Sequence, residues 1–489
     1  MAILAIKTSA YRNAVSCLHR LVSQEMWSGL WPQLPVWEVP ITSVTNGVHL
    51  PTWLNGDQAQ LYDQYLQPDW RERYPDPKIW DLVQDIPSRE LWEAHRKRKR
   101  NLISYVREHV VASAVNRKAS AAEQRRLADV LDPDAFTIGF ARRFATYKRA
   151  TLLFRDVARL KKILTNSDRP VQIVIAGKAH PKDQPGKMFI REIVQLSRDP
   201  EISQHIVFLE DYGIQVAREL VQGVDLWLNN PQRGEEACGT SGMKAGINGV
   251  LNLSILDGWF DEAYEISGGW AIGDRETYSD DQDEMHARAI YSILENEIVP
   301  MFYDTRGEEG VPEEWLRRMK QSLMYLSPQF NSQRMVGEYM SQLYQPAHLG
   351  FVEISQRGFA PAREKALWNK QVDSAWDRVN FVELGPGPDA TVVSGRPIPM
   401  RAVVDLAGLG PKDVRVEAVI GRVGANGQLE ETQVMTLVAG EQQGSSYVFT
   451  RDFVPHQTGR LGYSLRISPN HYDDPLTRPC HSLLKWGSG

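Results

Sequence analysis

The sequence predicts an α/β protein with a doubly wound parallel sheet, followed by an all-β module. Three observations support this fold class. Val171–Gly177 (VQIVIAG) is a continuous apolar run, as in a strand covered by helices on both faces. Between residues 75 and 345, short apolar strands alternate with segments of helical periodicity. After Val379, strand-like stretches follow one another, separated by Gly, Asn and Pro turns.

The individual elements follow from apolar spacing and turn residues, taken in chain order. Met1–Ile6 is expected to be a buried strand and Asn13–Met26 an amphipathic helix. The later helices are expected at Ser88–Ala114, Arg149–Thr165, Phe189–Ser197, Ile214–Gln222, Glu313–Tyr344 and Pro361–Val379. The parallel strands are expected at Phe136–Phe140, Val171–Gly177, Ile206–Leu209, Val224–Asn229 and the apolar Gly249–Leu256. The all-β module is expected to be a sandwich of Val392–Leu406, Val414–Val423, Gln433–Val438, Tyr447–Phe453 and Leu461–Ile467.

Length and composition limit the possible classes of protein. At ~150 residues per domain, 489 residues suggest about three domains, which we place at residues 1–70, 71–379 and 380–489. Hydrophobic residues make up 42% and charged residues 24%, which excludes a disordered chain, a collagen-like fibre and a coiled coil. The 56 Lys and Arg stand against 61 Asp and Glu, a net charge of -5 that argues against nucleic-acid binding.

Cysteine use and the length of apolar runs bear on the compartment. Cys17, Cys238 and Cys480 are too few and too scattered for a disulfide framework or a zinc site, so we expect no metal and a reducing cytoplasm. No run approaches ~18 uninterrupted apolar residues, so we expect no membrane span. The first residues lack a basic leader, so we expect no signal peptide.

A first candidate segment lies just past the strand expected at Phe136–Phe140. It places Arg142, Arg143, Lys148 and Arg149 within eight residues, at the rim where parallel sheets bind ligands. Clustered cations suit an anion, and the arginine fork matches phosphate. A solvated helix start with acidic neighbours explains the cluster equally well.

A second segment combines a loop of small residues with a lysine. Gly239-Thr-Ser-Gly242 leads into an expected helix, and Lys244 follows about one turn inside it. A phosphate loop beside a lysine is what an aldehyde cofactor with its own phosphate requires. Glu235 and Glu236 precede the loop and could accept hydrogen bonds from sugar hydroxyls. A glycine-rich turn is the simpler alternative, and the spacing of a Walker-type phosphate loop is absent.

Two further segments are weak signals by themselves. Asn46-Gly47 is a turn signal, and the nearby His49 is more often structural than catalytic. Phe208-Leu-Glu-Asp-Tyr212 ends an expected strand with an acid pair and a phenol.

Taken together, these segments resemble the α-glucan phosphorylase family (glycogen, starch and maltodextrin phosphorylases), in particular a branch found in many bacteria. Glu236-Ala-Cys-Gly-Thr-Ser-Gly-Met-Lys244 resembles the family's cofactor signature E-A-S-G-T-[GS]-x-M-K. Asn248-Gly-Val-Leu and Leu256-Asp-Gly258 resemble its N-G-x-L…L-D-G. Arg142-Arg-Phe-Ala-Thr-Tyr-Lys-Arg149, Thr45-Asn-Gly-Val…Trp53 and Phe208-Leu-Glu-Asp-Tyr212 resemble three more family motifs, in the family's order.

The resemblance implies a glycosyltransferase (hexosyltransferase) that releases glucose 1-phosphate from α-1,4-glucan. It implies that Lys244 carries pyridoxal 5′-phosphate as a Schiff base, and that the cofactor phosphate exchanges protons with the substrate phosphate. Arg143 and Lys148 would bind the substrate phosphate. The cofactor phosphate would be held by Arg142, Tyr212, Thr240 and Ser241, and the glucosyl group by Asn46, Tyr147, Glu236, Ala237, Cys238 and Gly239.

The resemblance also implies a Rossmann-like domain within a two-domain, GT-B-like architecture. The expected partners are α-1,4-glucan and inorganic phosphate, and either a second copy of the chain or a separate N-terminal phosphorylase half. Residues 1–70 match only the last piece of the family's N-terminal domain.

The sequence departs from the family pattern at several positions. Cys238 replaces a serine, Ala145-Thr146 replace His-Glu, and Ala10 falls where family members have a glucose-binding histidine. Two alternative functions therefore stay open. One is a nucleotide-sugar glycosyltransferase resembling glycogen synthase, which would contain no pyridoxal cofactor. The other is a non-catalytic glucan-binding fragment.

Overall fold

The computed structural model describes residues 1–276, 282–307, 309–385, 393–425, 427–456, 459–471 and 483–487. Val392 and Cys480 lie outside these described residues. The chain forms two compact units. We call Asn13–Ser23 with Ile41–Tyr339 the parallel-sheet unit. We call Met1–Arg12, Gln24–Pro40 and Met340–Gly489 together the antiparallel unit.

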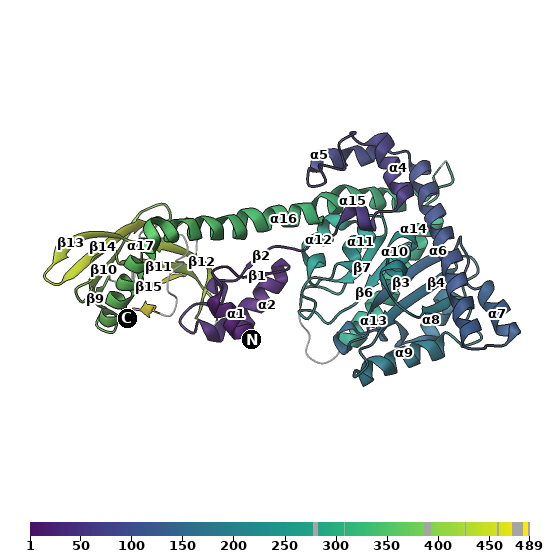
Figure 1. Ribbon diagram of the computed structural model, residues 1–489, viewed down its shortest axis with the longest axis horizontal. Coiled ribbons are helices and arrows are strands. Elements are labelled where there is room, and N and C mark those ends of the chain that lie inside the picture. The colour runs from purple at the N-terminus through teal and green to yellow at the C-terminus, as the bar shows by residue number, and fades with distance from the viewer. Residues whose placement is uncertain are drawn as a thin grey trace. The chain divides into compact units, whose positions relative to one another are not determined.

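The parallel-sheet unit is built on a six-stranded sheet of order β5-β4-β3-β6-β7-β8 (Figure 1). Every pairing in it is parallel. The chain starts in the middle at β3, winds to one edge, returns to the centre and continues to the other edge. This is the order of a doubly wound sheet, as predicted. The strands are β3 (Phe136–Arg143), β4 (Val171–Lys178), β5 (Ile206–Leu209), β6 (Leu226–Asn229), β7 (Leu251–Ile255) and β8 (Trp270–Ile272).

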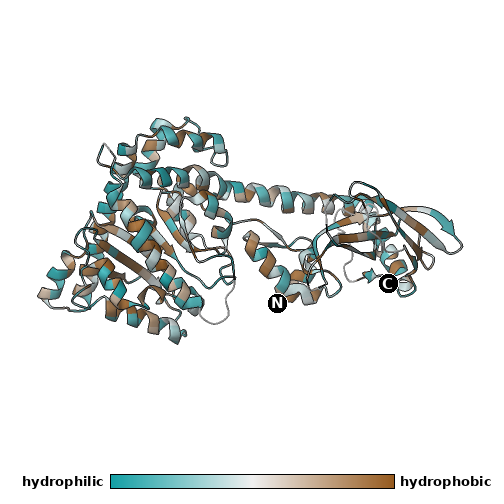
Figure 2. Ribbon diagram, turned by 180° about the vertical axis from the view of Figure 1, so that it is seen from behind, coloured by the Kyte–Doolittle hydropathy of each residue, from teal (hydrophilic) through white to brown (hydrophobic). Residues whose placement is uncertain are grey.

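Helices cover both faces of this sheet, which explains why its strands are apolar along their length (Figure 2). Successive side chains point to opposite faces. Ile173 and Ile175 of β4 belong to the same buried cluster as residues of α8, α13 and α15, whereas Val174 and Ala176 belong to the cluster that includes residues of α6 and α10.

The unit contains several of the predicted helices, together with helices that were not predicted. They are α2 (Cys17–Trp27, shared with the other unit), α3 (Leu50–Trp53), α4 (Gly56–Tyr65), α5 (Pro77–Trp80), α6 (Ser88–Asn116), α7 (Ala121–Ala128), α8 (Val157–Leu164), α9 (Gln184–Leu196), α10 (Ile214–Gly223), α11 (Ser241–Gly246), α12 (Trp259–Ser267), α13 (Gln282–Ile293), α14 (Val299–Asp304), α15 (Glu313–Gln329) and α16 (Ser332–Tyr339). A two-stranded sheet of β1 (Asn13–Ala14) and β2 (Thr42–Ser43) ties its two segments together.

The helix expected at Arg149–Thr165 is wrong in its first half. Arg149 has a left-handed backbone with φ of 48°, which ends the short 3-10 turn Thr146–Lys148. The α-helix begins only at Val157, because the Asp156 side chain caps it by accepting from the Arg159 N–H. Around this turn, Lys148 contacts Glu236 and Arg149 donates to the Asn230 carbonyl.

The antiparallel unit contains two four-stranded sheets, of order β13-β14-β10-β9 and β12-β11-β15-β16. Their strands are β9 (Asn380–Leu384), β10 (Ile398–Asp405), β11 (Val414–Val423), β12 (Leu429–Thr436), β13 (Val438–Gln443), β14 (Ser446–Phe453), β15 (Leu461–Pro469) and β16 (Lys485–Trp486). Ala402 and Val404 of one sheet share a core with Val416 and Leu465 of the other. The predicted all-β texture after Val379 is confirmed, and α17 (Gln345–Trp376) precedes it.

The strand expected at Met1–Ile6 is wrong, because these residues begin α1 (Ala2–Thr8). No residue of this helix is buried, so no sheet neighbour supplies hydrogen bonds to an extended backbone. Hydrogen bonds within the helix satisfy the backbone of these residues instead, and Ala, Leu and Lys favour the helical state. In α17, residues Gln356–Phe359 leave helical geometry, so the helix is broken near its middle. Across the described ranges, no helix has the length and apolar character needed to cross a membrane.

Candidate functional site

The candidate site lies at the carboxyl end of the parallel sheet, where the strand order reverses between β3 and β6. β3 ends with Arg142 and Arg143, and the turn after it carries Tyr147 and Lys148. β6 leads through a loop to α11, which carries Lys244. Ligands of doubly wound sheets bind at this reversal point, so both candidate segments end where a ligand is expected.

A buried cluster of charge occupies this edge, and we call Arg142, Lys148 and Glu236 the cation cradle. Arg142 Nη2 donates to Glu236 Oε2 at 2.7 Å, and Lys148 Nζ contacts the same oxygen. All three side chains are less than a tenth exposed. Arg142 Nη1 is also buried, yet it has no hydrogen-bond partner among the described residues. Two buried cations therefore share one carboxylate, which leaves positive charge and a donor to spare.

The pKa values of the cradle reflect this imbalance. Burial, followed by the charge of Arg142, lowers the pKa of Lys148 to about 8. Burial also lowers the pKa of Arg142, although Glu236 opposes the shift. An anion bound here would stabilise both cations in their charged forms.

The loop that carries Glu236 is fixed by Asp257, which follows β7. Its Oδ2 accepts the backbone N–H of Gly234 and of Glu236, each at 3.0 Å. Burial raises the pKa of Asp257 to about 6. Gly258 adopts φ of 53°, and a Cβ there would lie 2.2 Å from the Cys238 carbonyl oxygen. Two residues of the Leu256-Asp-Gly258 motif therefore hold the loop. The Asp257 carboxylate accepts its backbone N–H groups, and Gly258 leaves room for the Cys238 carbonyl.

Lys244 lies in α11 as predicted, and its amine faces an aromatic ring. Nζ is 3.9 Å from the centroid of the Trp53 ring. Burial lowers the pKa of the amine. Within the described ranges Lys244 forms no ion pair with an acid, so no carboxylate holds its proton. A half-buried amine without an acidic partner suits attack on an aldehyde.

The remaining predicted residues surround these groups. Asn46 hydrogen-bonds Cys238, whose pKa burial raises to about 12, so this thiol stays neutral. The Ala237 carbonyl accepts from Ser16 Oγ at 2.7 Å. Burial raises the pKa of Tyr212, and the charge of Arg142 partly offsets the shift.

The structure thus brings some predicted residues together and leaves others apart. Arg142, Lys148 and Glu236 are in contact, and Lys148 Nζ lies 4.5 Å from the Tyr147 ring. Gly239, with φ of 73°, and Thr240 precede α11, whereas Ser241 Oγ accepts from Trp227 Nε1 at 3.2 Å. Arg143 is exposed at the end of β3.

Sequence reasoning missed the contact of Trp53 with Lys244 and the roles of Asp257 and Asn248. All three stand in motifs that the resemblance quotes, but spacing along the chain carries no sign of their partners. The structure also shows why Arg149 differs from its cationic neighbours. Its guanidinium donates to the carbonyls of Asn230 and Pro231 and to Asp283, so its charge is already satisfied.

The residues present fit an aldehyde cofactor that carries a phosphate. The unpartnered Arg142 Nη1 and the surplus charge of the cradle suit an anionic group, and Lys244 offers the amine. A Cβ at Gly242 would lie 2.5 Å from Asn252 Oδ1, so the start of α11 has no room for a larger residue.

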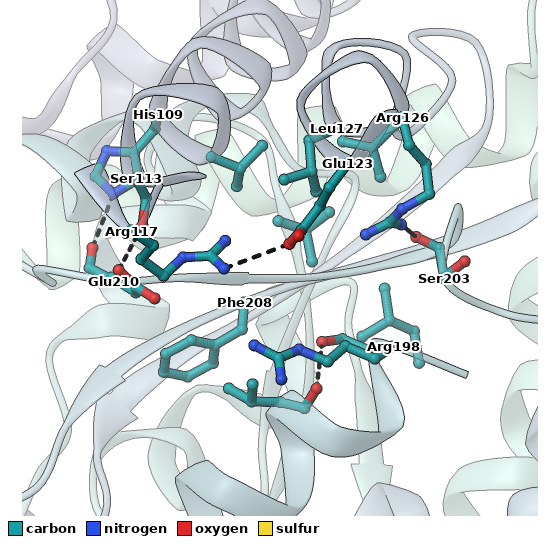
Figure 3. A pocket seen from close by; sticks show the side chains of 16 residues that line it. His109, Ser113, Arg117, Glu123, Arg126, Leu127, Arg198, Ser203, Phe208 and Glu210 are labelled. Atoms are coloured by element: carbon teal, nitrogen blue, oxygen red, sulfur yellow. Dashed lines mark hydrogen bonds and ion pairs between the residues drawn. The ribbon is translucent and has the colours of Figure 1, made fainter. Parts of the chain in front are cut away.

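A separate pocket opens at the edge strand β5 (Figure 3). Ser113 Oγ donates to Glu210 Oε2 at 2.6 Å along one wall. The pocket is also lined by three arginines at the C-terminal ends of α6, α7 and α9, namely Arg117, Arg126 and Arg198. Cations at helix C-termini are stabilised by the helix dipole, so their positions are explained without a ligand.

Comparison with known proteins identifies a family and several relatives. A model of the carbohydrate phosphorylases matches residues 1–268, and one of the glycogen phosphorylase C-terminal domain matches residues 376–478. The maltodextrin phosphorylase of Thermococcus litoralis is 39% identical over 99% of this chain and 57% of its own length. The glycogen phosphorylase of Mycobacterium tuberculosis is 37% identical over 96% of this chain and 55% of its own length.

The glycogen phosphorylase of Aquifex aeolicus is 46% identical over 70% of this chain and 49% of its own length. The chain thus spans about half the length of the curated relatives it matches. The matched region contains β3, the cradle and Lys244 of α11. From this match over residues 1–268 and from these relatives, the chain belongs to the carbohydrate phosphorylase family.

Proposed function

We propose that this chain supplies the pyridoxal-phosphate-binding part of an α-glucan phosphorylase. The reaction transfers a glucosyl group from the end of an α-1,4-glucan to inorganic phosphate and releases glucose 1-phosphate. The observation that carries the proposal is the surplus of buried positive charge at the carboxyl end of β3. Arg142 and Lys148 share only the Glu236 carboxylate, and Arg142 Nη1 has no partner among the described residues.

Each residue then has a defined task in the proposed reaction. Lys244 binds the cofactor through its amine. Arg143 and Lys148 bind the substrate phosphate. Their positive charge stabilises the negative charge on this phosphate, which faces an oxocarbenium-like glucosyl group in the transition state. When bound, the cofactor supplies a phosphate that can donate and accept a proton beside the substrate phosphate. The cofactor phosphate is held by Arg142, Tyr212, Thr240 and Ser241, and the glucosyl group by Asn46, Tyr147, Glu236, Ala237, Cys238 and Gly239.

The wider architecture is part of the same proposal. Residues 71–379 form the Rossmann-like domain of a two-domain, GT-B-like enzyme, residues 1–70 are the last part of its other domain, and residues 380–489 form a β-sandwich module. The chain spans about half the length of its relatives, and we propose that an N-terminal phosphorylase half or a second copy of the chain closes the site over the substrate and excludes water.

Borohydride reduction after incubation with pyridoxal 5′-phosphate tests the cofactor site. Peptide mass mapping is expected to find the reduced adduct on Lys244, and a Lys244→Arg variant should not form it. Lys187→Arg is the matched control, because Lys187 is an exposed lysine of the same unit whose amine donates to the Pro181 carbonyl. An adduct spread evenly over exposed lysines would contradict the proposal.

Phosphorolysis of maltodextrin in inorganic phosphate tests the reaction. Glucose 1-phosphate should form when an N-terminal phosphorylase half is supplied as a second polypeptide, and Lys148→Met should lower the rate by about 10²–10³-fold. Glucan binding without cofactor or phosphorolysis would favour a non-catalytic fragment. Transfer from a nucleotide sugar without pyridoxal phosphate would favour a synthase.

A further inference from the structure

The amine of Lys244 lies against the face of the Trp53 ring, at 3.9 Å from its centroid. Two opposing effects act on its proton. Burial favours the neutral amine and lowers its pKa, whereas an indole face attracts the ammonium form. The position of the ring therefore influences how much of the amine is neutral. An amine adds to an aldehyde carbon through its lone pair, with loss of water, so only the neutral form reacts.

Two buried amide side chains fix the position of Trp53. The residue ends α3, a helix of only four residues. Its carbonyl oxygen accepts from Gln222 Nε2 at 3.0 Å and from Asn248 Nδ2 at 2.9 Å. Gln222 comes from α10 and Asn248 follows α11, so two elements hold one carbonyl.

Asn248 uses every polar group it has. Its Nδ2 also donates to the Lys244 carbonyl at 2.8 Å, and its Oδ1 accepts the Asn55 N–H at 2.9 Å. Its own carbonyl accepts from Arg98 Nη1 at 2.8 Å. The side chain is fully buried. A single amide group thus joins the backbone that carries the amine to the backbone that carries the ring.

We propose that Asn248 and Gln222 form an amide clamp that positions the Trp53 ring over the Lys244 amine and so sets how readily that amine reacts. The two are positioning residues, since they act through Trp53 and through the Lys244 backbone. The inference deepens the proposed function and rests on it only for the identity of the aldehyde. The clamp itself is a property of this chain.

The test measures the pKa of Lys244 in the cofactor-free chain of 489 residues. Reductive methylation with formaldehyde and cyanoborohydride from pH 6 to 10, quantified at Lys244 by peptide mass mapping, gives a rate profile whose midpoint is that pKa. Trp53→Leu keeps an apolar cover but removes the ring face, so the pKa should fall by about 0.5. This variant calibrates the contribution of the ring.

The clamp variants should then reproduce the effect of losing the ring. Asn248→Ser and Gln222→Met should each lower the Lys244 pKa, with the larger effect for Asn248→Ser. Each should have no further effect in the Trp53→Leu background, because residues that act through one contact are not additive. Trp53→Phe should restore most of the original pKa.

Gln172→Met is the matched control. Gln172 is also a buried amide of the same unit, but it bonds Asp132 and Thr137 and touches neither Trp53 nor Lys244. It should lose stability without moving the Lys244 pKa.

If both clamp variants behave like Gln172→Met while Trp53→Leu shifts the pKa, the clamp is overturned. If Trp53→Leu itself leaves the pKa unchanged, the ring has no role and the proposal fails at its first step. Should Asn248→Ser not fold, Gln222→Met decides the question alone. Failure of Lys244 to bind pyridoxal phosphate would count against the proposed function and would leave these pKa results intact.

Discussion

Two buried clusters of charge lie at opposite ends of the central strands, and they differ in how their charges are satisfied. At the amino end, which we call the amino-end cluster, Asp225 accepts from Lys99 Nζ at 2.9 Å and bonds His95 Nε2 at 2.6 Å. It also accepts the Thr137 N–H at 2.8 Å. Lys99 donates in addition to the Ala135 carbonyl. The Asp225 carboxylate therefore pairs directly with one permanent cation, and every lone pair is engaged. Among the described residues, Arg98 contacts this cluster only through His95, at 3.4 Å from its Nδ1.

At the carboxyl end, the cation cradle sets two cations, Arg142 and Lys148, against one carboxylate and leaves Arg142 Nη1 without a partner among the described residues. Burial alone does not separate the two clusters, because every side chain in them is less than a tenth exposed. The balance of charge and the satisfaction of hydrogen bonds do. The hydrogen-bonding groups of the Asp225 carboxylate are satisfied by the protein itself, whereas in the proposed function an anion completes the cradle.

The largest effect should come from breaking the complete cluster. Asp225→Ala leaves Lys99 buried without its counter-ion and should lower the free energy of unfolding by about 3–5 kcal/mol. Urea denaturation measures this change. Added phosphate should not reverse it, because no anion can reach a buried site already closed by packing. If phosphate restored the stability of Asp225→Ala, the amino-end cluster would not differ from the cradle in its response to anions.

A buried histidine that contacts Arg149, the residue after Lys148 of the cradle, adds a group that is kept neutral. His286 Nδ1 accepts from Arg149 Nη1 at 2.9 Å, so this histidine must stay neutral, and burial lowers its pKa to about 4. Its folded pKa lies below the ordinary 6.5, so its contribution to stability is complete above pH 6.5 and is lost as the pH falls toward 4.

The wild-type chain should lose about 3 kcal/mol more than His286→Asn between pH 6.5 and 4. Asparagine keeps an acceptor for Arg149 but cannot gain a proton. Urea denaturation at several pH values checks the difference between the two chains. Parallel pH profiles would mean that folding does not lower the pKa of His286.

The cradle should respond to a broken pair in a different way from the amino-end cluster. Glu236→Gln removes the shared carboxylate and should lower the free energy of unfolding by about 1–3 kcal/mol. Unlike Asp225→Ala, this loss should be reversed by millimolar phosphate, which supplies the missing negative charge. Thermal unfolding with and without phosphate compares the two variants directly. If phosphate restored the stability of neither variant, both clusters would be purely structural.

The charge of Lys148 should make anion binding dependent on pH. Because its pKa lies at about 8, sulfate affinity should fall by about tenfold as the pH rises from 7 to 9. Sulfate is the better probe, since its own charge is constant over this range. Lys148→Met should bind sulfate weakly and with a flat profile in calorimetric titrations. A pH-dependent profile that survives Lys148→Met would assign the titration to another group.

The smallest effect should come from an exposed pair. Arg288 donates to Glu284 one helical turn away at 2.9 Å, and both side chains are largely exposed. Arg288→Ala should change the free energy of unfolding by no more than about 0.5 kcal/mol, because water screens such pairs. The same urea series measures it. A loss as large as that of Asp225→Ala would mean that burial does not govern these energies.

Much of the parallel sheet could be predicted, since continuous apolar runs such as Val171–Gly177 have few other uses. The predictions that were wrong concern segments whose burial we inferred without knowing which element would pack against them. Met1–Ile6 is apolar enough for a strand, but no sheet receives it, so it forms a helix. Arg149 has a helical neighbourhood in sequence, yet its left-handed backbone points its guanidinium to two carbonyls.

The sequence alone determined the local patterns to which we assign the chemistry. The cations after β3, the small-residue loop and Lys244 are local patterns, and chain spacing records local patterns well. Tertiary structure alone decided which of them meet. Glu236 lies 94 residues from Arg142, and Asn248 lies 195 residues from the Trp53 carbonyl it binds. Periodicity shows which side of an element is buried, but only the crossover topology of the sheet decides what it is buried against. For this reason, the surplus charge of the cradle and the balanced charge of Asp225 became visible only in the folded chain.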